Sequence, residues 1–294
     1  MKALVLGSGG QLGVDLVREL DRRAHQVAGF TRQQLDITSA PQVEEAFRAH
    51  QPGWVINAAA YNMVDVAERE PLAAMQANGL AARHLAACCR SQGAILLQFS
   101  TDHVFDGSKS SPYTEQDLPR PVSAYGVSKL AGELYVQAYL ERFFVVRTSG
   151  VFGPAGRTTN RSNFPELMLR LAAEGRPLRV VDDFFASPTY APALAARSLD
   201  LLENKAPFGI YHIGGGRPIS WYQFALLVLA QAGVRANITP AKEQDYPTPA
   251  RRPKYAALSN AKMEAVGLAP MPRLEEVVGE YLVKRLDYSA APLG

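Results

Sequence analysis

Residues 1–13 read Met1-Lys2-Ala3-Leu4-Val5-Leu6-Gly7-Ser8-Gly9-Gly10-Gln11-Leu12-Gly13, and this stretch decides the fold. The apolar run at its start predicts a buried β-strand over residues 2–7. The glycines that follow permit a tight turn and a close approach of backbone, so we expect a helix to begin at Gln11. The first turn of such a helix offers unpaired backbone N–H groups, which favour a phosphate. We therefore expect this turn to bind the pyrophosphate of a dinucleotide through Gly7, Gly10, Gln11, Leu12 and Gly13.

The composition of the chain is that of an ordinary globular protein, with 294 residues, 47% hydrophobic and 20% charged. Its net charge of +3 is small and does not favour a nucleic-acid partner. No apolar run approaches the roughly 18 residues of a membrane span, and the start does not read as a signal peptide. Adjacent Cys88 and Cys89 in a predicted helix point apart and cannot pair, which is typical of a reducing compartment. We expect a cytoplasmic protein with no membrane partner.

Strand-like and helix-like segments alternate through the first half of the chain. Near-continuous apolar runs predict strands over residues 2–7, 26–30, 54–57, 95–100 and 143–148. Helical periodicity predicts helices over residues 11–23, 41–50, 72–92 and 123–141. This alternation predicts an α/β fold, a Rossmann-type doubly wound parallel sheet with helices on both faces.

The pattern changes after about residue 150, where glycine and proline become frequent. Helices are expected near residues 163–174, 191–203, 220–232 and 274–286, with short strands at 178–181 and 209–213. We therefore expect a dinucleotide-binding domain over residues 1–150. Residues 151–294 should form a smaller C-terminal α/β lobe that mainly binds substrate, packed on the first domain as a second unit or as part of one body.

The residues after the second predicted strand bear on the choice of cofactor. An acidic residue usually binds the adenine ribose of NAD there, but the run Ala28-Gly29-Phe30-Thr31-Arg32 has none. Arg32 is suited to a 2′-phosphate, which favours NADPH over NADH, although it can also be a solvated surface residue. Asp36 precedes the next helix and either reaches the adenine or caps a turn.

A tyrosine and a lysine four residues apart open the predicted helix at residue 123. Tyr125 and Lys129 share one helix face. With 12 tyrosines in the chain such a pair can arise by chance, so its position carries the weight. It follows the strand that ends in Ser100-Thr101-Asp102, at the carboxyl edge where ligands of such sheets bind.

These groups are suited to the reduction of a carbonyl by hydride transfer. The alkoxide that forms must be protonated, and a phenol with its usual pKa near 10 is a poor acid at neutral pH. We expect the ammonium of Lys129 and the charge of oxidised nicotinamide to lower the pKa of Tyr125. Lys129 can also hold the nicotinamide ribose, and the Thr101 hydroxyl can bond the substrate oxygen.

Metal chemistry finds no support in the sequence. The five histidines show no metal-ligand spacing. His103 is nearest to the predicted site, and we expect it to pack there. No metal is assigned.

Several motifs together resemble those of a known family. They are Gly7-x-x-Gly10-Gln11-x-Gly13, Asn57-Ala58-Ala59-Ala60, Val64-Asp65-x-Ala67-Glu68, Ser100-Thr101-Asp102-x-Val104-Phe105-x-Gly107, Tyr125-x-x-x-Lys129-x-x-x-Glu133, Arg147-Thr148-Ser149, Ser187-Pro188-Thr189 and Tyr246-Pro247-Thr248-Pro249-Ala250-Arg251-Arg252-Pro253. Over essentially the whole chain they resemble the extended short-chain dehydrogenases/reductases, and within them the dTDP-4-dehydrorhamnose reductases.

The resemblance implies a reaction and a set of site residues. The reaction is reduction of the C4 ketone of dTDP-4-dehydro-L-rhamnose by NADPH or NADH, with Tyr125 as proton donor. Thr101 and Asp102 are implied to anchor the nucleotide-sugar substrate, and Asn163 and Arg251 to face it from the second lobe; Arg251 can instead form a structural salt bridge. The residues implied to line the cofactor are Asp36, Ile37, Ala60, Tyr61 and Asn62.

Two positions depart from the family pattern. Members commonly carry a tryptophan after Arg-Thr-Ser that packs on the sugar, whereas this chain has Gly150 there. Glycine leaves more room, so the sequence does not determine which hexose binds. Some members bridge a homodimer with Mg²⁺ through glutamates, but this chain has Asp15 and Pro192 at two of those positions. A homodimer is compatible with the resemblance, and the metal is not implied.

Two other functions remain open from the sequence. One is the same 4-ketoreduction on another deoxysugar nucleotide. The other is a non-catalytic, dinucleotide-binding regulatory subunit, because the β-subunit of methionine adenosyltransferase looks similar. The intact set of Thr101, Tyr125 and Lys129 favours an enzyme.

Overall fold

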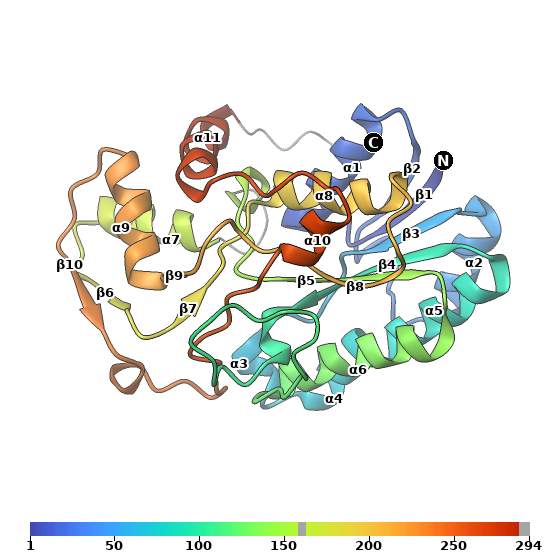
Figure 1. The fold of residues 1–294 in the computed structure, drawn as a ribbon, viewed down its shortest axis with the longest axis horizontal. Helices are drawn as coiled ribbons and strands as arrows, with labels where there is room; N and C mark the ends of the chain where they lie inside the picture. The colour runs from blue at the N-terminus through green and yellow to red at the C-terminus, as the bar shows by residue number, and fades with distance from the viewer. Residues whose placement is uncertain (158–162, 288–294) are drawn as a thin grey trace.

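The computed structural model describes residues 1–157 and 163–287 (Figure 1). Its centre is a six-stranded parallel sheet with the strand order β2-β1-β3-β4-β5-β8. The strands are β1 (Lys2–Leu6), β2 (Gln26–Phe30), β3 (Trp54–Asn57), β4 (Ile95–Thr101), β5 (Phe143–Thr148) and β8 (Gly209–His212). The predicted doubly wound α/β fold is confirmed, and all six strands lie within one residue of their expected bounds.

The sheet reverses its winding direction between β1 and β3. From β1 the chain moves outward to β2, then returns past β1 to β3, so that Leu6 pairs with both Phe30 and Asn57. Because all the strands are parallel, their carboxyl ends meet at one edge. A reversal of this kind opens a crevice at that edge, where ligands of such sheets bind.

Helices cover both faces of this sheet (Figure 1). One face carries α1 (Gln11–Arg22) and α8 (Ala191–Glu203), which pack on each other; the other carries α2 (Ala40–His50), α5 (Ala81–Gln92) and α6 (Ala124–Tyr139). Side chains of β1 alternate between the two: Ala3 and Val5 join one apolar cluster, Leu4 and Leu6 the other. This double burial explains why the strand is apolar at every position.

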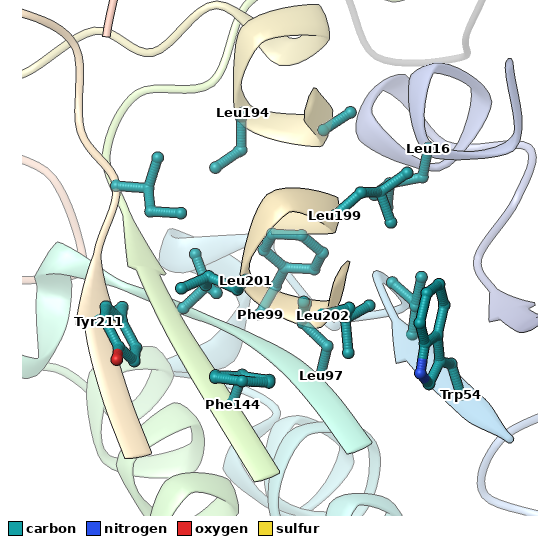
Figure 2. Packing of buried hydrophobic residues seen from close by; sticks show 14 of the residues in the cluster. Leu16, Trp54, Leu97, Phe99, Phe144, Leu194, Leu199, Leu201, Leu202 and Tyr211 are labelled. Carbon is teal, nitrogen blue, oxygen red and sulfur yellow. The ribbon is translucent and has the colours of Figure 1, made fainter. Parts of the chain in front are cut away.

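Figure 2 shows the first of these clusters from close by. Leu97 and Phe99 of β4 and Phe144 of β5 share this cluster with Leu199 and Leu202 of α8. The chain after residue 150 therefore helps to build the core of the first lobe. It does so again at β8, where Ile210 pairs with Val145 of β5.

The second lobe has its own apolar core, centred on Phe152, Phe224 and Tyr281. Two short sheets accompany it, β10 with β6 in parallel and β7 with β9 in antiparallel pairing. The elements are η3 (Pro154–Arg157), α7 (Phe164–Ala173), β6 (Leu178–Val181), β7 (Phe185–Ala186), β9 (Ile219–Ser220), α9 (Trp221–Gln231), β10 (Ile238–Ala241), η4 (Glu243–Asp245) and α11 (Leu274–Asp287). Of these, η3, β7, β9, β10 and η4 were not expected from the sequence.

The helix expected over residues 72–92 differs in one turn. It consists of α4 (Pro71–Met75), a π-helical turn η1 (Gln76–Leu80) and α5. Short elements that the sequence did not predict are α3 (Val64–Ala67), η2 (Asp102–Val104) and α10 (Ala261–Ala265). Within residues 1–157 and 163–287, no helix is both long and apolar enough to cross a membrane.

Candidate active site

The glycine turn after β1 is tightly packed against the loop that follows β3. Gly7 has a φ of +80°, and a Cβ there would lie 2.7 Å from the backbone nitrogen of Ala59. A Cβ on Gly13 would lie 2.0 Å from the carbonyl oxygen of Gly7. Side chains are excluded at both positions. The N-cap of α1 is Gly10, which has no side chain to occupy the N–H groups at the start of the helix.

The residues that follow this turn have mixed surroundings. Leu12 packs against the first apolar cluster, and Gln11 donates to the carbonyl of Val151, 2.9 Å away, in the second lobe. Ala60 and Asn62, expected to line the cofactor, are exposed beside the crevice, and Tyr61 is partly buried. Their roles stay predictions.

At the adenine end, the turn interpretation of Asp36 is the one that the geometry supports. Its Oδ1 accepts from the backbone N of Thr38 at 2.9 Å and from the Thr38 hydroxyl at 2.8 Å. These bonds, with the nearby charge of Arg32, lower the pKa of Asp36. Arg32 itself is exposed at the end of β2. The side chain of Ile37 is buried in the second apolar cluster, so only its backbone can border a cofactor.

The three predicted catalytic residues are brought to one place. Thr101 ends β4, and its side chain hydrogen-bonds the Tyr125 phenol from α6. Lys129, one turn further along α6, donates from Nζ to the carbonyl of Phe99 at 2.7 Å. The start of α6 packs closely against η2, because a Cβ on Gly126 would lie 2.4 Å from the carbonyl oxygen of His103.

Burial shifts the pKa of both titratable groups. It raises the pKa of Tyr125 to about 12; the Thr101 hydrogen bond opposes this shift and the charge of Asp102 adds to it. In the protein without cofactor the phenol pKa is therefore raised and not lowered, because burial is the largest cause. The expected effect of oxidised nicotinamide stays a prediction. Burial also lowers the pKa of Lys129 to about 8, against the charge of Glu133. At neutral pH both groups hold their protons.

Asp102 links the ends of β4 and β5. It is buried, and its Oδ1 accepts from the Thr101 hydroxyl at 3.0 Å while Oδ2 accepts from the Ser149 hydroxyl at 2.6 Å. Both carboxylate oxygens thus have protein partners, and the geometry favours orientation of Thr101 over the expected direct contact with substrate. Gly150 follows Ser149 at this edge, with a φ of +50°.

Asn78 lies in the π-helical turn and was missed from the sequence. Its Oδ1 accepts from the backbone N of Tyr61 at 2.8 Å, and its Nδ2 donates to the Tyr61 carbonyl at 2.9 Å and to the Ser128 hydroxyl at 2.9 Å. Ser128 in turn donates to the carbonyl of Tyr125 at 2.7 Å. One buried amide thus joins the predicted cofactor loop to α6. Gly132 allows this close approach, since its Cβ would lie 2.3 Å from the Asn78 carbonyl oxygen.

Glu133 organises the layer beneath the site, where the sequence assigned it no role. It is fully buried, accepts from the Ser100 hydroxyl at 2.5 Å, and forms an ion pair of 2.6 Å with buried Arg147. These bonds hold β4, β5 and α6 together. Arg147 also contacts His212 of β8 at 3.4 Å.

His103 packs beside Tyr125, the predicted proton donor, as expected. Its ring meets the Tyr125 ring edge-on, with 5.5 Å between centroids. Burial lowers its pKa, and its Nδ1 is buried with no hydrogen-bond partner among the described residues.

The two substrate residues expected from the second lobe have different positions. Asn163 caps α7 by accepting from the backbone N of Glu166 at 3.0 Å, and its Nδ2 donates to Gln11 and to the Gly153 carbonyl, each at 2.9 Å. It therefore connects the lobes, and the geometry does not support direct contact with sugar. Arg251 is exposed.

The neighbouring Arg252, which sequence reasoning passed over, is the arginine that spans the lobes. It pairs with Asp65 of α3, with 2.7 Å between Nη2 and Oδ2. No sequence signal distinguishes it from Arg251, because the choice depends on the path of the backbone.

The position of Asp15 does not suit a divalent ion. Burial raises the pKa of Asp15 to about 7, while the charges of Arg18 and Lys284 act in the opposite direction. A carboxyl with a raised pKa carries less negative charge at neutral pH, and nearby cationic side chains repel a divalent ion. Both effects disfavour a metal at this position. In the part of the chain that the structure describes, no three His, Cys, Asp or Glu side chains are grouped to hold one.

This fold and this arrangement of Thr101, Tyr125 and Lys129 define a dinucleotide-binding oxidoreductase of the short-chain dehydrogenase/reductase class. More narrowly, the chain belongs to the family described as the RmlD substrate binding domain, whose model matches residues 1–286.

Several named proteins are similar to this chain over nearly its whole length. The chain is 36% identical over 284 residues to the spore coat polysaccharide biosynthesis protein SpsK of Bacillus subtilis, covering 97% of this chain and 98% of that protein. It is 39% identical to a dTDP-4-dehydrorhamnose reductase of Streptomyces griseus, over 91% and 88% of the two chains. A crystal structure of the Bacillus anthracis dTDP-4-dehydrorhamnose reductase with NADP matches with a TM-score of 0.91 at 32% identity, covering 96% and 99%.

Proposed function

We propose that this protein reduces the C4 ketone of dTDP-4-dehydro-L-rhamnose to dTDP-L-rhamnose, with NADPH as hydride donor. The observation that carries the proposal is the meeting of Thr101, Tyr125 and Lys129 at the carboxyl edge of the sheet, the same edge at which the glycine turn follows β1. Relatives that carry this activity in their names match nearly the whole chain.

The proposed chemistry follows from the protonation states of the site. The bound cofactor supplies the hydride. Tyr125 donates its proton to the oxygen of the former ketone, and its raised pKa keeps that proton in place until negative charge develops on the substrate. The Thr101 hydroxyl donates its one proton to Asp102 in this structure, and it would redirect that proton to the same oxygen when substrate binds. The ammonium of Lys129 stabilises the phenolate that remains.

Three features support NADPH as the physiological cofactor. The end of β2 lacks the acidic residue that binds the ribose of NAD, and Arg32 is exposed there. Asp36 is the first acidic residue after β2 in the sequence, and its Oδ1 accepts two hydrogen bonds from Thr38. The Bacillus anthracis structure contains NADP. Replacement of Arg32 by alanine should reduce the preference for NADPH over NADH and leave turnover at saturating cofactor unchanged.

The reaction is tested directly by NADPH oxidation with purified protein and dTDP-4-dehydro-L-rhamnose, and by identification of the sugar product. A dTDP-4-keto-6-deoxy-D-glucose reductase of Streptomyces niveus is 34% identical over 91% of this chain, so that ketosugar belongs in the same assay. If the protein reduces dTDP-4-keto-6-deoxy-D-glucose and not dTDP-4-dehydro-L-rhamnose, its substrate is another deoxysugar nucleotide. Tight NADPH binding without turnover of either sugar would contradict an enzymatic role and favour a regulatory subunit.

We also propose a cytoplasmic location. Cys88 and Cys89 are unpaired, and Cys89 is buried in the apolar core. Free thiols of this kind are typical of a reducing compartment.

A further inference from the structure

Gly150 lies beside the hydrogen bonds that orient Thr101, the residue proposed to bind the substrate oxygen. It follows Ser149, which donates to Asp102, and Asp102 also accepts from Thr101. A Cβ built on Gly150 would lie 3.0 Å from Cη2 and 3.6 Å from Cζ2 of Trp221. A larger residue at position 150 would therefore need the space that the Trp221 ring occupies. The absence of a side chain leaves this part of the carboxyl edge to an aromatic ring from another element.

Trp221 is held in this place by the second lobe. It is the first residue of α9, and its N-cap Ser220 forms a capping box with Gln223. The backbone N of Trp221 donates to the Phe184 carbonyl at 3.3 Å. Its ring packs against Phe164, with 4.8 Å between ring centroids. The indole is thus fixed on one side and only partly buried, so part of its surface is open to a ligand.

We propose that the Trp221 ring, which occupies the space beside Gly150, packs on the sugar ring of the substrate and determines the preference for a 6-deoxyhexose. This inference rests on the proposed function. The C–H face of a hexose and the methyl group of a 6-deoxy sugar are apolar, and a rigid indole offers a large apolar surface with one N–H donor. Sugar and ring would meet next to Thr101, at the carbonyl that reacts.

The chain allows a direct optical test, because it has only two tryptophans. The other, Trp54, is 5% exposed and belongs to the apolar core. In a Trp54→Phe background the fluorescence therefore reports Trp221. With NADPH present, titration with dTDP-L-rhamnose should change this fluorescence, whereas dTDP alone should leave it nearly unchanged. Equal responses to both, or no response to the sugar nucleotide at saturation, would overturn the proposal.

Kinetics provide the second test. Trp221→Leu should raise KM for the ketosugar about tenfold, keep kcat within about threefold and leave NADPH affinity unchanged, while Trp221→Phe should recover most of the loss. Gly150→Ala should also raise KM, since its Cβ would displace the indole. The control is Tyr222→Leu, in the same turn of α9. An unchanged KM in Trp221→Leu would overturn the proposal.

The two proposals fail in distinguishable ways. If the wild-type protein reduces neither ketosugar, the proposed function fails. The fluorescence titration still decides whether Trp221 contacts a sugar nucleotide. If the wild-type protein is active and Trp221→Leu matches it in KM, while the Trp54→Phe protein responds equally to dTDP-L-rhamnose and to dTDP, only the role of Trp221 fails. Should Trp221→Leu not fold, the fluorescence titration of the Trp54→Phe protein decides whether Trp221 contacts the sugar.

Discussion

Arg252 binds both carboxylate oxygens of Asp65, although the two residues are 187 positions apart in the chain. Nη1 lies 3.0 Å from Oδ1 and Nη2 lies 2.7 Å from Oδ2. Asp65 belongs to α3, whose Ala67 packs in the same apolar cluster as Tyr125. The segment of residues 246–253 is thereby fastened to the wall of the active site. Two parallel charged hydrogen bonds define an orientation as well as a distance.

We expect this pair to influence substrate binding more than chemistry. Arg252→Met should raise KM for the ketosugar by about five- to tenfold, because a half-exposed bidentate pair contributes on the order of 1 kcal/mol. The values of kcat and NADPH affinity should change little, and high salt should reduce the difference from wild type. The matched control is Arg179→Met, which breaks the exposed pair with Asp245 at the near end of the same segment. Similar KM changes in both variants would show that the Asp65 contact has no special role.

Removal of the Tyr125 hydroxyl should separate binding from proton transfer. Tyr125→Phe keeps the ring that packs against His103, so the fold and NADPH affinity should be preserved. Turnover should fall by roughly 10² or more, because no other described hydroxyl takes the place of the phenol as acid. Single-turnover NADPH oxidation measures the step, and Tyr135→Phe on the same helix serves as control. Near-normal turnover would remove Tyr125 from its role as proton donor.

Asn78 offers a test of the link between the cofactor loop and α6. In Asn78→Ala the backbone N and carbonyl of Tyr61 lose their hydrogen bonds to the Asn78 amide, and each lost bond should cost on the order of 1 kcal/mol. We expect a lower Tm and weaker NADPH binding. Asn78→Asp retains an acceptor for the Tyr61 N and should fall between alanine and wild type in NADPH affinity.

The control for this prediction is Gln76→Ala, which changes an exposed residue of the same π-helical turn. Thermal unfolding and a titration with NADPH measure the two effects. A normal NADPH affinity in Asn78→Ala, with only Tm lowered, would limit Asn78 to a role in stability.

The parts of this protein that were predictable from sequence depend on local rules. A strand with both faces covered must be apolar at every position, and β1 is. Gly7 and Gly13 are required by contacts within a single turn and its flanking elements. Tyr125 and Lys129 share a face because of helix geometry alone. These features do not need knowledge of which distant segments meet.

The parts that were missed depend on contacts between distant segments. The short run of β8 reads like a strand of the second lobe, and only the route of the chain shows that it pairs with β5. Nothing local selects Arg252 over Arg251. The raised pKa of Tyr125 in the protein without cofactor was not anticipated, because it depends on burial depth, which the motif does not contain. Gly150 suggested open space, whereas the Trp221 ring lies next to it.

Lys129 leads to a prediction with opposite signs for activity and stability. Burial lowers its pKa to about 8, so the ammonium is present below that pH and is lost above it. Because Tyr125 stays protonated up to about pH 12, a decline of kcat/KM as pH rises through about 8 reports Lys129. In the unfolded chain the lysine pKa is about 10.4, so between about pH 8 and 10.4 the unfolded state binds more protons. The contribution of Lys129 to the free energy of unfolding should therefore rise with pH in that window.

Two variants test this assignment of the pH dependence. In Lys129→Arg the charge is permanent, so the decline of kcat/KM near pH 8 should disappear, whatever the absolute rate. In Glu133→Gln the charge that favours the ammonium is removed, and the decline should move to lower pH. That variant also leaves buried Arg147 without its partner, which should cost about 3–5 kcal/mol of stability. If the decline persists at the same pH in Lys129→Arg, another group titrates there and the ammonium of Lys129 is not what the reaction requires.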